Sequence, residues 1–99
     1  MLPNIETPAI VQMKNARDMK LKQFDLEIQK LQEQLGIMNA KLSDATEAFQ
    51  KNAAAGADVK TTSVTTIQKQ IILVQIKLQN KIFDRAKVLK DDTINIYNA

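Results

Sequence analysis

The chain has 99 residues and a formal net charge of +3, and it contains neither cysteine nor histidine. Their absence excludes a disulfide scaffold, the usual zinc sites and most nucleophile–base pairs. Aromatic residues make up 4% of the chain, and glycine and proline number two each. This composition is typical of long helices with few turns, so we expect one all-α domain over residues 1–99.

The first helix is predicted to run from about residue 8 to residue 54, after an extended segment over residues 1–7. Thr7 is a competent N-cap, and proline at position 8 is tolerated because its missing N–H would be unpaired in the first turn. Gly36 lies inside the helix and weakens it by about 1 kcal/mol relative to alanine, without ending it.

The main corner of the chain is predicted near Gly56, which can adopt the left-handed conformation that closes a helix. A connecting loop should follow, so that the loop covers residues 55–62. The second helix is then predicted over about residues 63–96. Folded back antiparallel, the two helices would form a long, coiled-coil-like hairpin, with Pro8 to Met19 extending beyond the second helix.

Apolar residues recur in unbroken steps of three and four along the first helix, as do the a and d positions of a coiled coil. We call this stripe the seam, and it predicts that one face of the helix packs against a partner helix. That partner helix could belong to the same chain or to a neighbouring chain. The seam consists of Leu21, Phe24, Ile28, Leu31, Leu35, Met38, Leu42, Ala45 and Phe49.

The second helix carries a matching stripe of Val64, Ile67, Ile71, Val74 and Leu78. Beyond Leu78 we expect the apolar stripe to continue one residue later in the heptad, at Ile82, Ala86, Leu89, Thr93 and Ile96. Two successive steps of four, from Leu78 to Ile82 to Ala86, would be a stutter that locally unwinds a supercoil.

A second group of apolar residues lies outside these stripes and is the predicted assembly interface. A two-helix hairpin buries only one face of each helix, whereas the second helix is apolar most of the way round between residues 71 and 78. Single exposed apolar residues are ordinary, but this density favours self-association or docking on another protein. The group comprises Ile10, Val11, Met13, Met19, Leu26, Ile37, Ile72, Leu73, Ile76, Phe83 and Val88.

Charge is divided unevenly: residues 1–50 carry six basic and seven acidic side chains, and residues 51–99 carry eight basic and four acidic. Lys77, Lys81 and Arg85 lie four residues apart and form a basic strip that is a candidate anion contact. The strip could also be a solvated face, or it could pair with carboxylates of the first helix. Those carboxylates are Asp25, Glu27, Glu33, Asp44 and Glu47.

We find no pattern of residues for catalysis, for a metal or for a cofactor, so we expect a non-enzymatic protein without a small-molecule substrate. The longest apolar run, Ile71–Val74, is far shorter than the about 20 residues that span a membrane. The start of the chain lacks the basic and apolar regions of a signal peptide. We therefore expect a cytoplasmic protein or one exported by a signal-peptide-independent route.

These observations favour a structural subunit that self-associates into a larger assembly or filament, such as a bacterial secretion-system or surface-appendage subunit. One alternative is a small coiled-coil chaperone or adaptor that binds a helical partner protein. Another is a weak binder of nucleic acid or of a membrane surface, through the basic strip.

Overall fold

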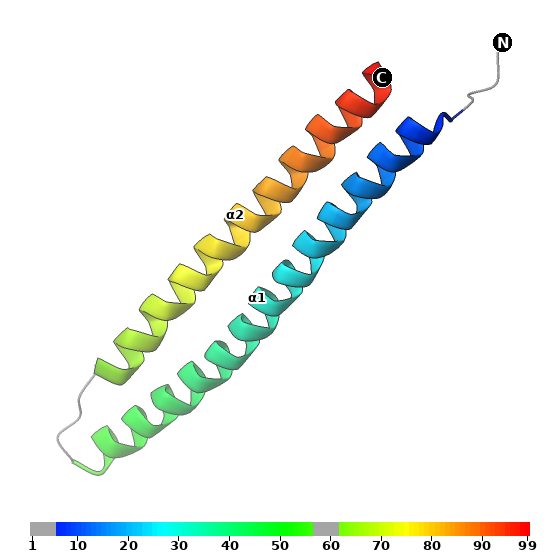
Figure 1. Ribbon diagram of the computed structural model, residues 1–99. Coiled ribbons are helices and arrows are strands. Elements are labelled where there is room, and N and C mark those ends of the chain that lie inside the picture. The colour runs from blue at the N-terminus through cyan, green and yellow to red at the C-terminus, as the bar shows by residue number, and fades with distance from the viewer. Residues whose placement is uncertain (1–5, 57–61) are drawn as a thin grey trace. The chain divides into compact units, whose positions relative to one another are not determined.

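The computed structural model describes residues 6–56 and 62–99 of the chain. This part consists of two α-helices, α1 (Pro8–Ala54) and α2 (Thr62–Asn98), and holds no strand. The helices run antiparallel, so the predicted all-α helical hairpin is confirmed (Figure 1). Most of the predicted extended segment and of the predicted loop, residues 1–5 and 57–61, lies outside the described residues.

Helix α1 begins where the sequence predicts, because the side chain of Thr7 caps it. The Thr7 Oγ1 accepts a hydrogen bond from the backbone N–H of Ile10 at 3.3 Å. The Thr7 carbonyl oxygen accepts from the N–H of Val11 at 3.0 Å, which is the first helical hydrogen bond. The N–H of Ile10, which a bare helix end would leave unpaired, is therefore satisfied by the cap.

The other end of α1 is closed by Gly56. The φ angle of Gly56 is 76°. Its N–H donates to the carbonyl oxygen of Ala53 at 3.1 Å, and the N–H of Ala55 donates to the carbonyl oxygen of Lys51 at 3.0 Å. A residue with a Cβ atom rarely adopts this left-handed conformation, which is why glycine is common just past a helix end.

The helices divide into two compact units, which are described separately. Unit 1 comprises Met1–Ile28 and Asn80–Ala99, and unit 2 comprises Gln29–Gln79. Each unit joins one segment of α1 to one antiparallel segment of α2. In unit 1, the α1 residues that contact α2 rise from position 17 to position 25 while their partners on α2 fall from 93 to 85.

The apolar core is small in both units. Among the described residues, the buried apolar side chains are Ile71 and Val74 in unit 2, at 7% and 4% exposure, and Ile96 in unit 1, at 9%. Helix α1 has no buried residue among those described. A pair of helices covers only one stripe of each partner, so the seam residues stay partly open to solvent at their flanks.

The predicted overhang of α1 is shorter than expected. Helix α2 continues to Asn98, two residues beyond the predicted end, and Met13 and Ala16 of α1 line a groove together with Asn95 and Ile96 of α2. The expectation that α1 is unaccompanied as far as Met19 is therefore wrong from Met13 onward. The last turns of α2 stay helical because Ile96 is packed and buried there.

Candidate functional site

The seam of α1 faces α2 in both units. Leu21, Phe24 and Ile28 are half-buried in unit 1. The same holds in unit 2 for Leu31, Leu35, Met38, Leu42, Ala45 and Phe49. All nine positions identified from the three–four spacing are thus half-buried, whereas most of the residues between them are exposed, as expected for a and d positions.

In unit 2 the facing stripe of α2 is apolar, as the sequence predicts. Ile71 and Val74 are buried, and Val64, Ile67 and Leu78 are half-buried. Near the end of this unit, Phe49 of α1 and Val64 of α2 line one groove of about 410 Å³. Unit 2 is therefore held mainly by contact between apolar side chains.

In unit 1 the facing stripe of α2 differs from the prediction. Ile82 and Leu89, which the sequence places in the stripe, are 48% and 39% exposed. The half-buried positions are instead Lys81, Arg85, Val88 and Asp92, which continue the earlier heptad in steps of three and four after Leu78. The predicted stutter after Leu78 is therefore wrong.

The irregular step occurs later, where Val88, Asp92 and Ile96 follow one another at intervals of four. The apolar pattern predicts the wrong inward stripe because α2 carries two adjacent stripes in this region, and the one that faces α1 is the more polar. Ion pairs with α1 explain how charged side chains occupy these inward positions.

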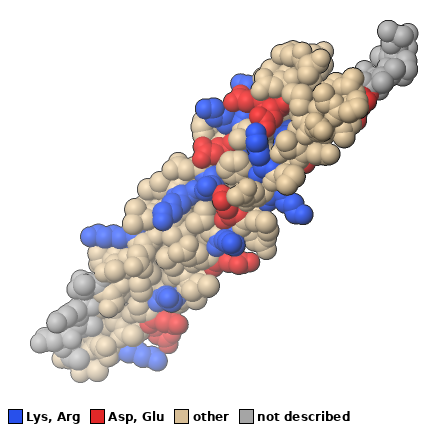
Figure 2. All heavy atoms as spheres, in the orientation of Figure 1, with Lys and Arg blue, Asp and Glu red and all other residues tan. Residues whose placement is uncertain are grey.

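Each charged residue that faces α1 in unit 1 has a partner there. Arg85 Nε donates to Asp25 Oδ1 at 2.6 Å, and Lys81 Nζ lies 2.9 Å from Glu27 Oε2. In the opposite sense, Lys20 Nζ donates to Asp92 Oδ2 at 3.0 Å. Figure 2 shows basic and acidic side chains next to one another on the surface.

Arg17 adds a hydrogen bond to a neutral group of α2, because its Nη1 donates to Thr93 Oγ1 at 3.2 Å. Partly exposed ion pairs each contribute only about 0–1 kcal/mol to stability. Their larger effect is on alignment, since a shift of α2 by one residue would move every cation away from its carboxylate. Charge pairing therefore favours this register in unit 1, where charged residues interrupt the apolar stripe of α2.

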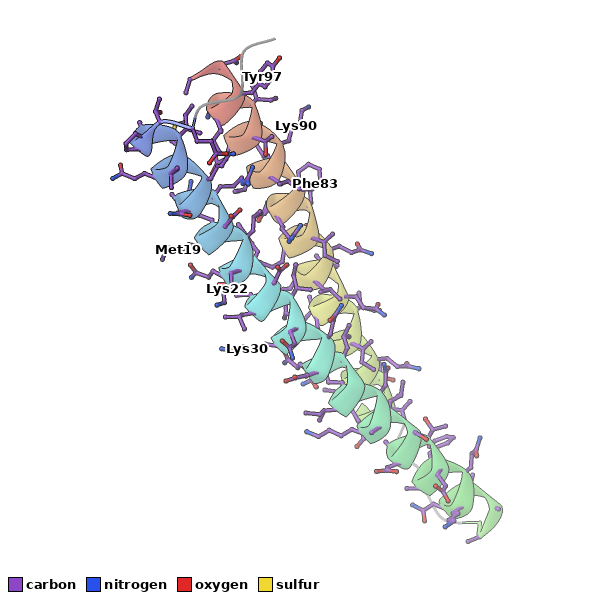
Figure 3. All side chains as sticks on the ribbon, turned by 90° about the vertical axis from the view of Figure 1, so that its right-hand side faces the viewer. Met19, Lys22, Lys30, Phe83, Lys90 and Tyr97 are labelled. Atoms are coloured by element: carbon purple, nitrogen blue, oxygen red, sulfur yellow. The ribbon has the colours of Figure 1, made fainter. Side chains whose placement is uncertain are left out.

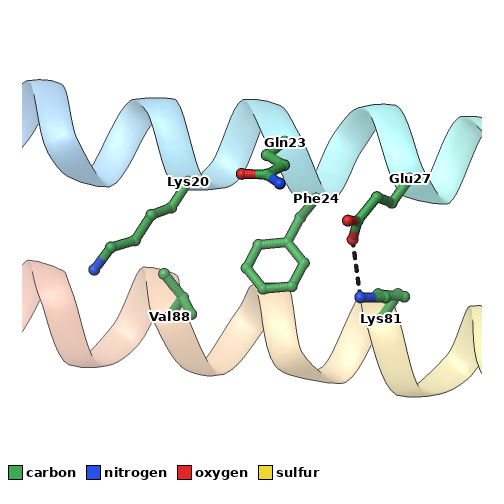
Figure 4. A pocket seen from close by; sticks show the side chains of 6 residues that line it. All are labelled: Lys20, Gln23, Phe24, Glu27, Lys81 and Val88. Carbon is green, nitrogen blue, oxygen red and sulfur yellow. Dashed lines mark ion pairs between the residues drawn. The ribbon is translucent and has the colours of Figure 1, made fainter.

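Lys81 lines a shallow groove of about 420 Å³ in unit 1, where it lies beside Glu27 at one end (Figure 4). Its ammonium group is 5.7 Å from the centre of the Phe24 ring, within the range of a cation–π contact. The hydrogen bond from Lys81 to Glu27, and then the charge of Glu27, raise the pKa of Lys81 above its ordinary value of 10.5. Phe24 and Val88 form the apolar part of the groove.

The predicted basic strip is largely committed to contacts within the chain. Lys81 and Arg85 are paired with carboxylates of α1, whereas Lys77 is exposed. Pairing with the first helix, one of the three interpretations of the strip, therefore accounts for two of its residues. An anion that approached the strip would have to compete with Glu27 and Asp25.

The residues of the predicted assembly interface fall into two groups. Ile10, Met13 and Val88 are half-buried in unit 1. The others are exposed, namely Val11, Met19, Leu26 and Phe83 in unit 1 and Ile37, Ile72, Leu73 and Ile76 in unit 2. In unit 1, Met19 points outward from α1, and Phe83 and Tyr97 point outward from the far side of α2 (Figure 3).

Four exposed apolar residues were not predicted as interface positions: Ile82, Leu89, Ile94 and Tyr97. The sequence pattern places Ile82 and Leu89 in the inward stripe. The signal that places them outward is the unbroken heptad spacing from Leu78 to Lys81 and Arg85. Ile94 lies outside both predicted stripes of α2, and Tyr97 stands among polar residues near the chain end.

The fold and this surface define the chain as a helical hairpin with partly open faces. Comparisons with protein-family models, with curated proteins and with solved structures found no match. Over the described residues, neither helix has a stretch long and apolar enough to cross a membrane. The same residues contain no group of three acidic side chains placed to hold a metal ion.

Proposed function

We propose that this chain is a non-enzymatic structural subunit, and that copies of it associate through the outer faces of their helices into a larger assembly or filament. Bacterial secretion systems and surface appendages are the setting that we propose for such a subunit. The proposal depends on one observation, the distribution of the large apolar side chains.

Among the described residues, three apolar side chains are buried, whereas twelve large apolar side chains are exposed. Exposed apolar residues are normal when they are scattered singly. Here three of them, Ile72, Leu73 and Ile76, lie within five positions of α2 on the side away from α1. Contiguous exposed apolar surface of this kind commonly marks a site of protein contact.

Sedimentation velocity of the purified chain over a concentration series tests the proposal. We expect the average sedimentation coefficient to rise with concentration. Ile76→Asp should lower it by placing a charge in the contact, whereas Gln75→Asp, which adds the same charge at an exposed polar position on the flank of α2 opposite Lys77, should leave it close to the parent value. A folded monomer at every concentration would contradict the proposal.

A further inference from the structure

The outer side of α2 in unit 2 is apolar and basic, and we call it the α2 outer face. It consists of Lys69, Ile72, Leu73, Ile76 and Lys77. The three apolar side chains are 54%, 59% and 48% exposed, and both lysines are exposed. Residues 62–79 contain these two lysines and no aspartate or glutamate. This face therefore presents a cation at each end of an uncovered apolar centre.

The outer side of α1 in the same unit has the opposite character, and we call it the α1 outer face. Its side chains occupy positions b, c and f of the heptad, away from the seam, and all are exposed. Three carboxylates flank a central group of one isoleucine and small residues, and Lys30 and Lys51 stand beyond its two ends. The face consists of Glu33, Gly36, Ile37, Ala40, Ser43, Asp44 and Glu47.

The charges of the two faces do not pair with each other within the chain. Glu33 accepts a hydrogen bond from the side-chain amide of Gln29 at 3.4 Å, and Glu47 lies 3.4 Å from Lys51, so both contacts run along α1. In the described part of the chain, no ion pair joins Lys69 or Lys77 to a carboxylate. Unit 1 differs, because its inward charges pair across the two helices. The two outer faces point away from the seam, so they cannot meet within one hairpin.

Gly36 lies near the centre of the α1 outer face. A Cβ atom built at this position would meet no other atom within 4 Å. Packing within the chain therefore does not require glycine there, although glycine weakens a helix interior. Glycine in a helix also lets another backbone or a bulky side chain approach closely. A second chain lying on this face would give the residue such a role.

We propose that the α2 outer face of one copy docks on the α1 outer face of a second copy. Bulky apolar side chains then cover a surface of small residues, and lysines at the ends of one face meet carboxylates at the ends of the other. This inference rests on the proposed self-association and names the surfaces that carry it. Because the two faces differ, each added copy leaves one face of each kind open, and the contact can repeat into a ring or a filament.

Two other occupants of the α2 outer face fit the charges less well. A second α2 outer face would bring four lysines together around the apolar contact, and like charges across an interface oppose association. An anionic lipid surface would match the lysines, but it would leave the acidic α1 outer face without a function. Both alternatives are distinguished by the test below.

The test uses two charge-reversed variants, Lys69→Glu/Lys77→Glu and Glu33→Lys/Asp44→Lys. Each variant alone carries two outer faces of the same sign, so its association should be about tenfold weaker than that of the parent chain. In an equimolar mixture the reversed α2 outer face of the first variant matches the reversed α1 outer face of the second, and the unchanged faces of the two variants also match each other. We expect sedimentation velocity of the mixture to show association within about threefold of the parent.

Lys87→Glu/Lys90→Glu is the matched control, because it makes the same change in net charge at exposed positions of α2 in unit 1. It should associate like the parent chain, and circular dichroism should show that all variants remain helical. If the parent associates but the mixture does not recover, this inference is wrong and the proposed self-association stands. The inference is also wrong if only the lysine variant loses association, or if it loses binding to anionic vesicles instead. A parent chain that is always monomeric overturns both proposals.

Discussion

Alanine at Gly36 and alanine at Gly56 are expected to change the stability of the hairpin in opposite directions. The substitutions are chemically identical, and at both positions an added Cβ would meet no described atom within 4 Å. The positions differ in backbone conformation, because Gly36 lies inside α1 whereas Gly56 has a φ angle of 76°. Any difference in outcome therefore reports the backbone and not packing.

Gly36→Ala should raise the free energy of unfolding by about 1 kcal/mol, which is the difference in helix propensity between the two residues. Gly56→Ala should lower it by about 1 kcal/mol or more, since a left-handed conformation costs a residue with a Cβ atom about 1–2 kcal/mol. For a chain of this size, 1 kcal/mol corresponds to about 4–8 °C in the midpoint of thermal unfolding.

Thermal unfolding followed by far-UV circular dichroism measures both shifts, at a concentration where sedimentation shows the lowest degree of association. The reasoning would be refuted if both variants moved the midpoint in the same direction. It would also be refuted if Gly36→Ala were destabilising in the dilute chain, because that would require a close contact at Gly36 within the hairpin.

Two further changes test the packing and the charges within each unit. In urea unfolding of the dilute chain, Val74→Ala should lower the free energy of unfolding by about 2 kcal/mol, because Val74 is 4% exposed. Leu73→Ala, at the adjacent and 59% exposed position, should lower it by under about 0.5 kcal/mol. Equal losses would contradict the inward position of Val74. Because the folded pKa of Lys81 lies above 10.5, its contribution to stability is complete below that pH and is lost as the pH rises through the raised value. When the pH is raised through this value, the free energy of unfolding of Lys81→Met should therefore fall by less than that of the parent chain. Lys22→Met, a change at an exposed position, is the control and should fall by as much as the parent.

The sequence predicts the ends of α1 well because the signals for them are local. Thr7 followed by Pro8 specifies a helix start, and Gly56 specifies an end, without reference to any distant residue. The seam of α1 is also predictable, since its apolar residues form one unbroken stripe and no second stripe competes with it. The fold class follows from two such helices joined by a short connection.

The facing stripe of α2 in unit 1 is not predictable from apolar periodicity. Ile82 and Leu89 are apolar and Lys81 and Arg85 are charged, so the pattern of hydrophobicity favours the wrong stripe. The lysine and arginine face inward because carboxylates of α1 lie opposite them, which is a property of two helices in a particular register. That register is known only once the hairpin is formed.

The outer faces of unit 2 could be identified only in part. The apolar residues of the α2 outer face are evident from the sequence, because the stretch around Ile72 and Leu73 exceeds what one partner helix can cover. The acidic α1 outer face was not evident, since Glu33 and Asp44 could equally have paired with lysines of α2. Only the arrangement of the hairpin leaves these carboxylates on the outside, where a second copy can reach them.

Thiol cross-linking between copies tests most directly whether the two outer faces meet. The chain contains no cysteine, so Ala40→Cys and Leu73→Cys each introduce a single thiol at the centre of one face. The two variants are mixed and treated with a short bifunctional thiol reagent. The account predicts that dimers joining Ala40→Cys to Leu73→Cys form in clear excess over dimers of either variant with itself. Mixed dimers at no more than the random proportion, or a predominance of Leu73→Cys dimers, would contradict it.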